Sequence, residues 1–68
     1  MKILIVDDEN KTRALINKMI LSLFPEYDFD ISTDGRDVLS ALQAFKSFQP
    51  DLILLDIKLP DGTGFDFL

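Results

Sequence analysis

The chain has 68 residues, a formal net charge of −5, and neither cysteine nor histidine. Disulfides, thiolate or imidazole metal sites and histidine-based acid–base catalysis are therefore excluded. The excess of acidic residues argues against direct contact between this segment and nucleic acid. The apolar runs are shorter than the about 18 residues of a membrane span, and the first residues do not resemble a signal peptide. We therefore expect a cytoplasmic chain with no membrane contact.

The first two elements follow from a change in hydrophobic period. Residues 3–6 form a short, largely β-branched apolar run, which is typical of a strand covered on both faces of a parallel sheet. From Asn10 to Phe24 apolar side chains recur at helical spacing, and Pro25 predicts the end of that helix. The residues expected on its buried face are Leu15, Ile16, Met19, Ile20 and Leu23.

The next two elements are predicted from an alternating pattern and a helix start signal. Phe29 and Ile31 alternate with polar residues, which indicates a short, half-exposed strand near a sheet edge. Thr33 or Asp34 is expected to cap a second helix, with Asp37 near its positive end. The predicted buried stripe of this helix consists of Val38, Leu39, Leu42 and Phe45.

The remaining residues predict a third strand and the start of a third helix. Residues 51–56 are predicted as a second fully buried strand, with a continuous apolar run at 52–55 between two aspartates. Residues 58–64 are predicted as a polar loop and residues 65–68 as a first helical turn. Right-handed crossovers then place helices on both faces of a parallel sheet, which is a three-layer α/β fold. The last strand would be left at an uncovered edge, so we expect this chain to be the first half of a larger domain.

Acidic residues follow both buried strands. Asp7 and Asp8 come after the first strand, and Asp56 ends the other. Neighbouring strands lie about 4.8 Å apart, so these carboxylates can approach to roughly 5 Å. Each pair would repel by about 3 kcal/mol at an effective dielectric of about 20, and a retained proton or a bound Mg²⁺ relieves this. One such Asp usually starts a turn, but three together indicate a site for phosphoryl transfer to aspartate.

These acids, with Pro60 and Gly64 four and eight residues beyond Asp56, resemble the receiver domain of two-component response regulators. The resemblance runs from Met1 to Leu68 and implies a flavodoxin-like (CheY-like) parallel sheet, first half only, with strand order 2-1-3. Residues 59–65 are also similar to receivers that carry a LytTR-type DNA-binding domain, so a separate output domain for DNA is a further expectation.

The resemblance assigns a role to each matching residue. Asp56 would be the phosphoacceptor, receiving its phosphoryl group from a sensor histidine kinase. Asp8 would ligate Mg²⁺ directly, Asp7 would hold it through water, and the backbone carbonyl of Lys58 would add a further ligand. Such a domain is a signalling phosphoacceptor rather than an enzyme.

The same resemblance gives the loop after Asp56 its role and limits what residues 1–68 can do. Pro60 and Gly64 would shape the loop that leads into the third helix, with Pro60 as an ordinary turn residue rather than a cis-proline. Receivers have five strands, and a hydroxyl residue and a lysine on the last two contact the phosphoryl group. No lysine here takes that role, so we expect a truncated receiver that retains the acid pocket without full transfer competence.

Motifs of other protein classes are incomplete in this sequence. A nucleotide-hydrolysing domain would need a phosphate loop ending in Gly-Lys-Ser/Thr, which is absent. A haloacid-dehalogenase-type phosphatase would need an acid where Lys58 stands, and a calcium loop from Asp30 would need one where Ala41 stands. Two alternatives remain: a non-catalytic interaction module that forms a homodimer through the uncovered third strand, and a degenerate receiver that never binds metal.

Overall fold

The computed structural model describes residues 1–67, and three parallel strands form its centre. They pair in the order β2-β1-β3, which confirms the predicted order 2-1-3. The strands are β1 (Lys2–Val6), β2 (Asp30–Gly35) and β3 (Leu52–Leu55). β2 lies at an edge of the sheet, as the alternating pattern of Phe29 and Ile31 predicts.

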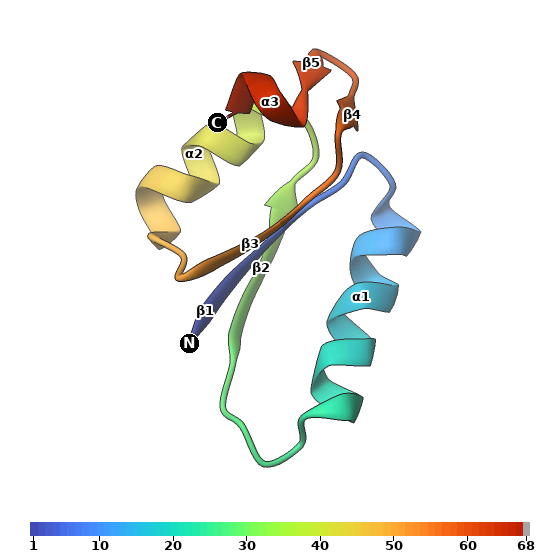
Figure 1. Ribbon diagram of the computed structural model, residues 1–68, viewed down its shortest axis with the longest axis vertical. Coiled ribbons are helices and arrows are strands. Elements are labelled where there is room, and N and C mark those ends of the chain that lie inside the picture. The colour runs from blue at the N-terminus through green and yellow to red at the C-terminus, as the bar shows by residue number, and fades with distance from the viewer. Residues whose placement is uncertain (68) are drawn as a thin grey trace.

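Two helices cover the two faces of this sheet and complete the three layers. Helix α1 (Asn10–Leu23) packs on one face and helix α2 (Val38–Phe48) on the other (Figure 1). The short helix α3 (Gly64–Phe67) lies beside α2. Leu68, which the predicted turn includes, lies outside the described residues. Within residues 1–67, no helix has both the length and the apolar character needed to cross a bilayer.

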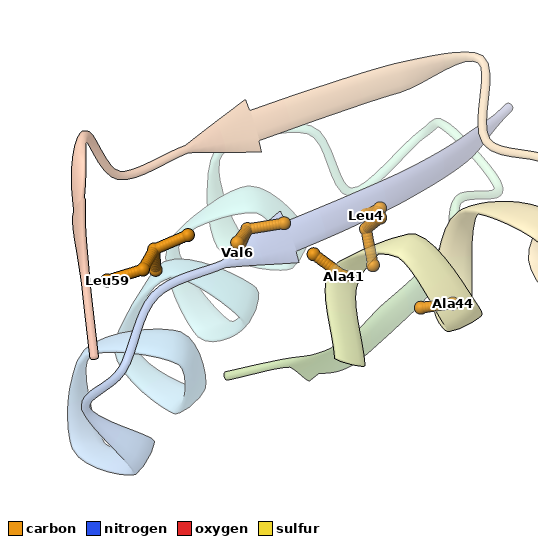
Figure 2. Packing of buried hydrophobic residues seen from close by; sticks show 5 residues of the cluster. All are labelled: Leu4, Val6, Ala41, Ala44 and Leu59. Atoms are coloured by element: carbon orange, nitrogen blue, oxygen red, sulfur yellow. The ribbon is translucent and has the colours of Figure 1, made fainter. Parts of the chain in front are cut away.

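The main core lies between β1 and α2. Its buried residues are Leu4, Val6, Ala41, Ala44 and Leu59. Figure 2 shows Leu4 on the side of β1 that faces the two alanines of α2, and Leu59 beside Val6 near the end of the strand. The two alanines are small, so α2 approaches the sheet closely and the β1 side chains fill the space. β1 is buried because it has a neighbour on each side. The expectation that the third strand is equally buried was wrong: Leu52 at its start is 44% exposed, since β3 is an edge strand.

The predicted buried face of α1 was also largely wrong. Leu15, Met19 and Leu23 are 58%, 50% and 66% exposed, whereas Ile16 and Ile20 are half-buried. The less exposed residues of α1 are Thr12, Arg13, Ile16, Asn17 and Ile20, and Arg13 is the buried member among them. α1 packs mainly on β1 and β2, and an open depression separates Ile16 from Leu54 and Leu55 of β3, so the rest of the stripe stays exposed.

Helix α2 begins later than the sequence pattern suggests. Thr33 and Asp34 are part of β2, and Asp37 is the capping residue. The backbone N–H of Ser40 donates to Asp37 Oδ1 at 2.8 Å, and the N–H of Asp37 donates to Ser40 Oγ at 3.0 Å. This reciprocal capping box sets the helix start. Ser40, Ala41 and Ala44 are the buried residues of the helix. Of the predicted stripe, Val38 and Leu42 pack against the core, whereas Leu39 and Phe45 are 61% and 46% exposed.

The predicted loop after β3 contains regular structure. β4 (Lys58–Leu59) and β5 (Gly62–Thr63) form a short antiparallel hairpin. Leu59 is buried in the main core, so an apolar side chain anchors the hairpin. The mostly polar composition of the segment did not indicate this. The peptide bond before Pro60 is trans, as expected of an ordinary turn residue.

The capping box predicts a specific pH dependence of stability. The hydroxyl of Ser40, followed by its backbone N–H, holds the pKa of Asp37 below its ordinary value. The stabilisation from the charged carboxylate is therefore complete above the unfolded-state pKa of about 3.9 and is lost as the pH falls through the lower folded-state pKa. Asp37→Asn keeps a capping oxygen but no charge, so wild type should be the more stable at pH 6.

Urea unfolding of both proteins between about pH 6 and pH 2 measures this difference. Both proteins contain the same other acids, so the effect of their titration drops out of the difference between the two free energies of unfolding. We expect the stability difference to shrink on acidification; a difference that stays constant or grows would contradict the role of the Asp37 charge.

Candidate functional site

The site lies where β1 and β3 end. Val6 and Leu55 are the last residues of the two strands and stand opposite each other in the parallel ladder. The next backbone groups continue that ladder: the N–H of Asp56 donates to the Val6 carbonyl at 2.9 Å, and the N–H of Asp7 donates to the Gly35 carbonyl at 2.9 Å. Sheet hydrogen bonds thus fix the backbone of both acids.

Three carboxylates converge at this edge, as the sequence predicts. One oxygen from each of Asp7, Asp8 and Asp56 lies within 4.8 Å of the others. Asp7 and Asp56 are half-buried and Asp8 is exposed. The donors are all anionic oxygens, the ligand type that Mg²⁺ prefers, so this cluster fits a magnesium ion in its chemistry and charge. An open depression of about 470 Å³ borders Asp7 and Asp56 and leaves them accessible from solvent.

Two further contacts hold the turn that carries Asp7 and Asp8. The carboxylate Oδ1 of Asp7 accepts the Glu9 N–H at 3.0 Å, so Asp7 also starts the turn into α1. Arg13 is only 5% exposed, and its guanidinium donates to the carbonyl oxygen of Asp7 and to the side-chain oxygen of Asn10. Arg13 was not identified from the sequence as part of the site. The available signal was its spacing: Arg13 lies three residues before Ile16, which places a cation on the helix face that packs on the sheet.

The loop after Asp56 is folded back on the end of β3. The N–H of Lys58 lies 3.4 Å from Asp56 Oδ1, and the N–H of Gly64 donates to the Ile57 carbonyl at 2.6 Å. A Cβ on Gly64 would stand 2.6 Å from the Asp56 carbonyl oxygen, which explains why only glycine fits there. Pro60 is exposed beyond β4. The metal-ligand role of the Lys58 carbonyl stays a prediction.

Comparison with known proteins agrees with this arrangement. Residues 3–68 match the response regulator receiver domain. The chain belongs to that family. A solved signal receiver domain, of a putative LuxO repressor protein from Vibrio parahaemolyticus, superposes with a TM-score of 0.72 at 30% identity. The match covers 97% of this chain and 47% of that one, so the parallel-sheet receiver fold is shared along almost the whole chain.

Curated relatives of the receiver chain are longer proteins with different activities. It is 38% identical over 69 residues to a protein-glutamate methylesterase/protein-glutamine glutaminase from Rhizobium etli, covering 98% of this chain and 18% of the relative. It is 35% identical over 65 residues to the transcriptional regulatory protein DegU of Brevibacillus brevis, covering 96% and 26% respectively. The chain therefore spans about a fifth to a quarter of these relatives, and the receiver domain is what they share with it.

The close approach at Gly64 predicts a local effect of substitution. In Gly64→Ala the added methyl group meets backbone, which cannot move without displacing the end of β3, so a loss of about 1–3 kcal/mol is expected in urea unfolding. The matched control is Gly62→Ala, whose Cβ would first meet side-chain atoms and not backbone: the Asp66 carboxylate oxygen at 2.7 Å and Val38 Cγ2 at 3.1 Å. Equal losses in the two variants would contradict the proposed constraint.

Proposed function

We propose that the receiver chain accepts a phosphoryl group on Asp56 from a phosphohistidine of a sensor histidine kinase. A carboxylate oxygen of Asp56 attacks the phosphorus, the P–O bond forms, and the P–N bond to the imidazole breaks. The leaving imidazole keeps the bonding electron pair and takes a proton, so the products are an aspartyl phosphate and neutral histidine. The observation that carries the proposal is the three-carboxylate cluster around Asp56 in a chain of this family.

We further propose that Asp7, Asp8 and Asp56, with the Lys58 carbonyl, hold Mg²⁺. A bound Mg²⁺ would supply positive charge that offsets the repulsion between these acids and an incoming phosphoryl group. The residues of the chain do the positioning. The sheet fixes the Asp7 and Asp56 backbones, Arg13 fixes the Asp7 carbonyl, and the Lys58 N–H orients one oxygen of Asp56.

The scope of the activity is limited by what residues 1–68 contain. We propose that the chain acts as a cytoplasmic phosphoacceptor module and that, by itself, it transfers slowly, because no residue takes the place of the hydroxyl and lysine groups implied by the resemblance. The relatives named above differ in activity, so no particular output is proposed. A LytTR-type output domain also stays a prediction.

Self-association through β3 stays the second candidate. β3 forms one edge of the three-stranded sheet, and its first residue, Leu52, is exposed. An apolar edge strand can pair with a second copy. The acid cluster favours phosphoacceptance as the primary function, because edge pairing gives no reason for three acids to converge.

Phosphorylation of purified chain by acetyl phosphate tests the proposal. With Mg²⁺ present, intact-protein mass spectrometry should show the mass of one added phosphoryl group, sensitive to hydroxylamine as acyl phosphates are. Asp56→Asn should abolish the adduct, since the amide is a far weaker nucleophile, and EDTA should suppress it. The matched control is Asp28→Asn, an exposed aspartate outside the cluster, which should be labelled like wild type. Labelling that persists in Asp56→Asn, or an unlabelled wild type, would contradict the proposal.

A further inference from the structure

Two carboxylates bind the N-terminus of α2, and one of them comes from the hairpin that follows Asp56. Asp37 accepts the Ser40 N–H from within the helix start. Asp61, which lies between β4 and β5, accepts the Val38 N–H on Oδ1 at 2.6 Å and the Leu39 N–H on Oδ2 at 3.1 Å. Together they satisfy three of the amides that a helix N-terminus leaves without an intrahelical partner.

Asp61 is not needed to define where α2 begins. Asp37 and Ser40 already form a complete capping box at that end. The additional contact joins residues 22 and 23 positions apart, so its effect is to fix the hairpin against the helix. The adjacent Gly62 lies so close that a Cβ there would stand 3.1 Å from Val38 Cγ2, which shows that the hairpin and the helix start are in contact.

The same hairpin is connected to the candidate site at its other end. The N–H of Gly64 donates to the Ile57 carbonyl, and the Gly64 backbone packs against the Asp56 carbonyl. Lys58, whose N–H faces Asp56 Oδ1, is the first residue of β4. The segment is therefore attached at its base to the phosphoacceptor and at its tip to α2.

We propose that Asp61 is a positioning residue: by binding the first two amides of α2, it holds the β4–β5 hairpin, and with it the Lys58 backbone, in place beside Asp56. The carboxylate suits this task because its two oxygens bind adjacent N–H groups and its charge is favourable at the positive end of the helix. This inference rests on the proposed function for its consequence at the metal site, but the holding of the hairpin is independent of metal.

Two measurements on the whole chain test this role. The first is amide hydrogen exchange without divalent ions. The exchange rate of the Gly64 N–H, compared with the rates of the β1 amides, reports opening of its hydrogen bond to the Ile57 carbonyl. The second is the dissociation constant for Mg²⁺ alone, from NMR shifts of the Asp7, Asp8 and Asp56 amides. In Asp61→Ala, Gly64 should exchange faster relative to β1, and the Mg²⁺ dissociation constant should rise by roughly tenfold, as for other groups that orient metal ligands.

The matched control is Asp37→Ala, which removes the other carboxylate from the same helix end. It should weaken α2 while leaving the relative exchange of Gly64 and the Mg²⁺ affinity as in wild type. Asp61→Asn keeps one oxygen acceptor and should restore part of the Gly64 protection. Equal effects of Asp61→Ala and Asp37→Ala, or unchanged Gly64 exchange in Asp61→Ala, would overturn the inference. Wild type that fails to bind Mg²⁺ while Gly64 still responds to Asp61→Ala would support the positioning role and contradict the metal part of the proposed function.

Discussion

The acid cluster depends on the parallel pairing of β1 with β3. That pairing brings the carboxylates that follow the two strands close together, although they carry the same charge. Val6 and Leu55 lie opposite each other, so the acids that follow them have no freedom to separate along the sheet. The close approach of three carboxylates does not itself stabilise the folded chain. In the proposed function this crowding has a use, because a bound cation would offset the repulsion between the acids and an incoming phosphoryl group.

The elements around the acids act mainly to keep that edge in place. Arg13 reaches from α1 to the Asp7 carbonyl, and Gly64 brings the following hairpin back onto the Asp56 carbonyl. Leu59 anchors the hairpin in the core shared by β1 and α2, and Asp61 joins its tip to the start of α2. Each face of the sheet therefore supplies a contact that fixes the backbone beside the cluster.

The parallel sheet and the acids at its carboxyl edge were predictable because both follow from patterns within single strands, whereas the strand order 2-1-3 came from the resemblance to receiver domains. Continuous apolar runs mark strands that need neighbours, and an acid after each run must lie at the shared carboxyl edge. Helix faces were predicted less well. The start of α2 depends on the competition between Asp34 and Asp37, which the Ser40 capping box decides. The exposure of Leu15 depends on which strands α1 packs against. The role of Asp61 required knowledge of a contact between segments far apart in sequence.

A double-mutant cycle of Asp8→Asn and Asp56→Asn, measured by urea unfolding in EDTA, tests the enforced approach of the acids most directly. If the carboxylates repel across the strand ends, each substitution raises the free energy of unfolding. The increase in the double variant should be smaller than the sum of the two single increases. The difference, which is the coupling energy, should be about 0.5–3 kcal/mol, as is typical of residues in contact. Adding Mg²⁺ should reverse the order, so that wild type becomes the most stable. Strictly additive effects in EDTA would show that the two carboxylates do not meet, and would contradict the account.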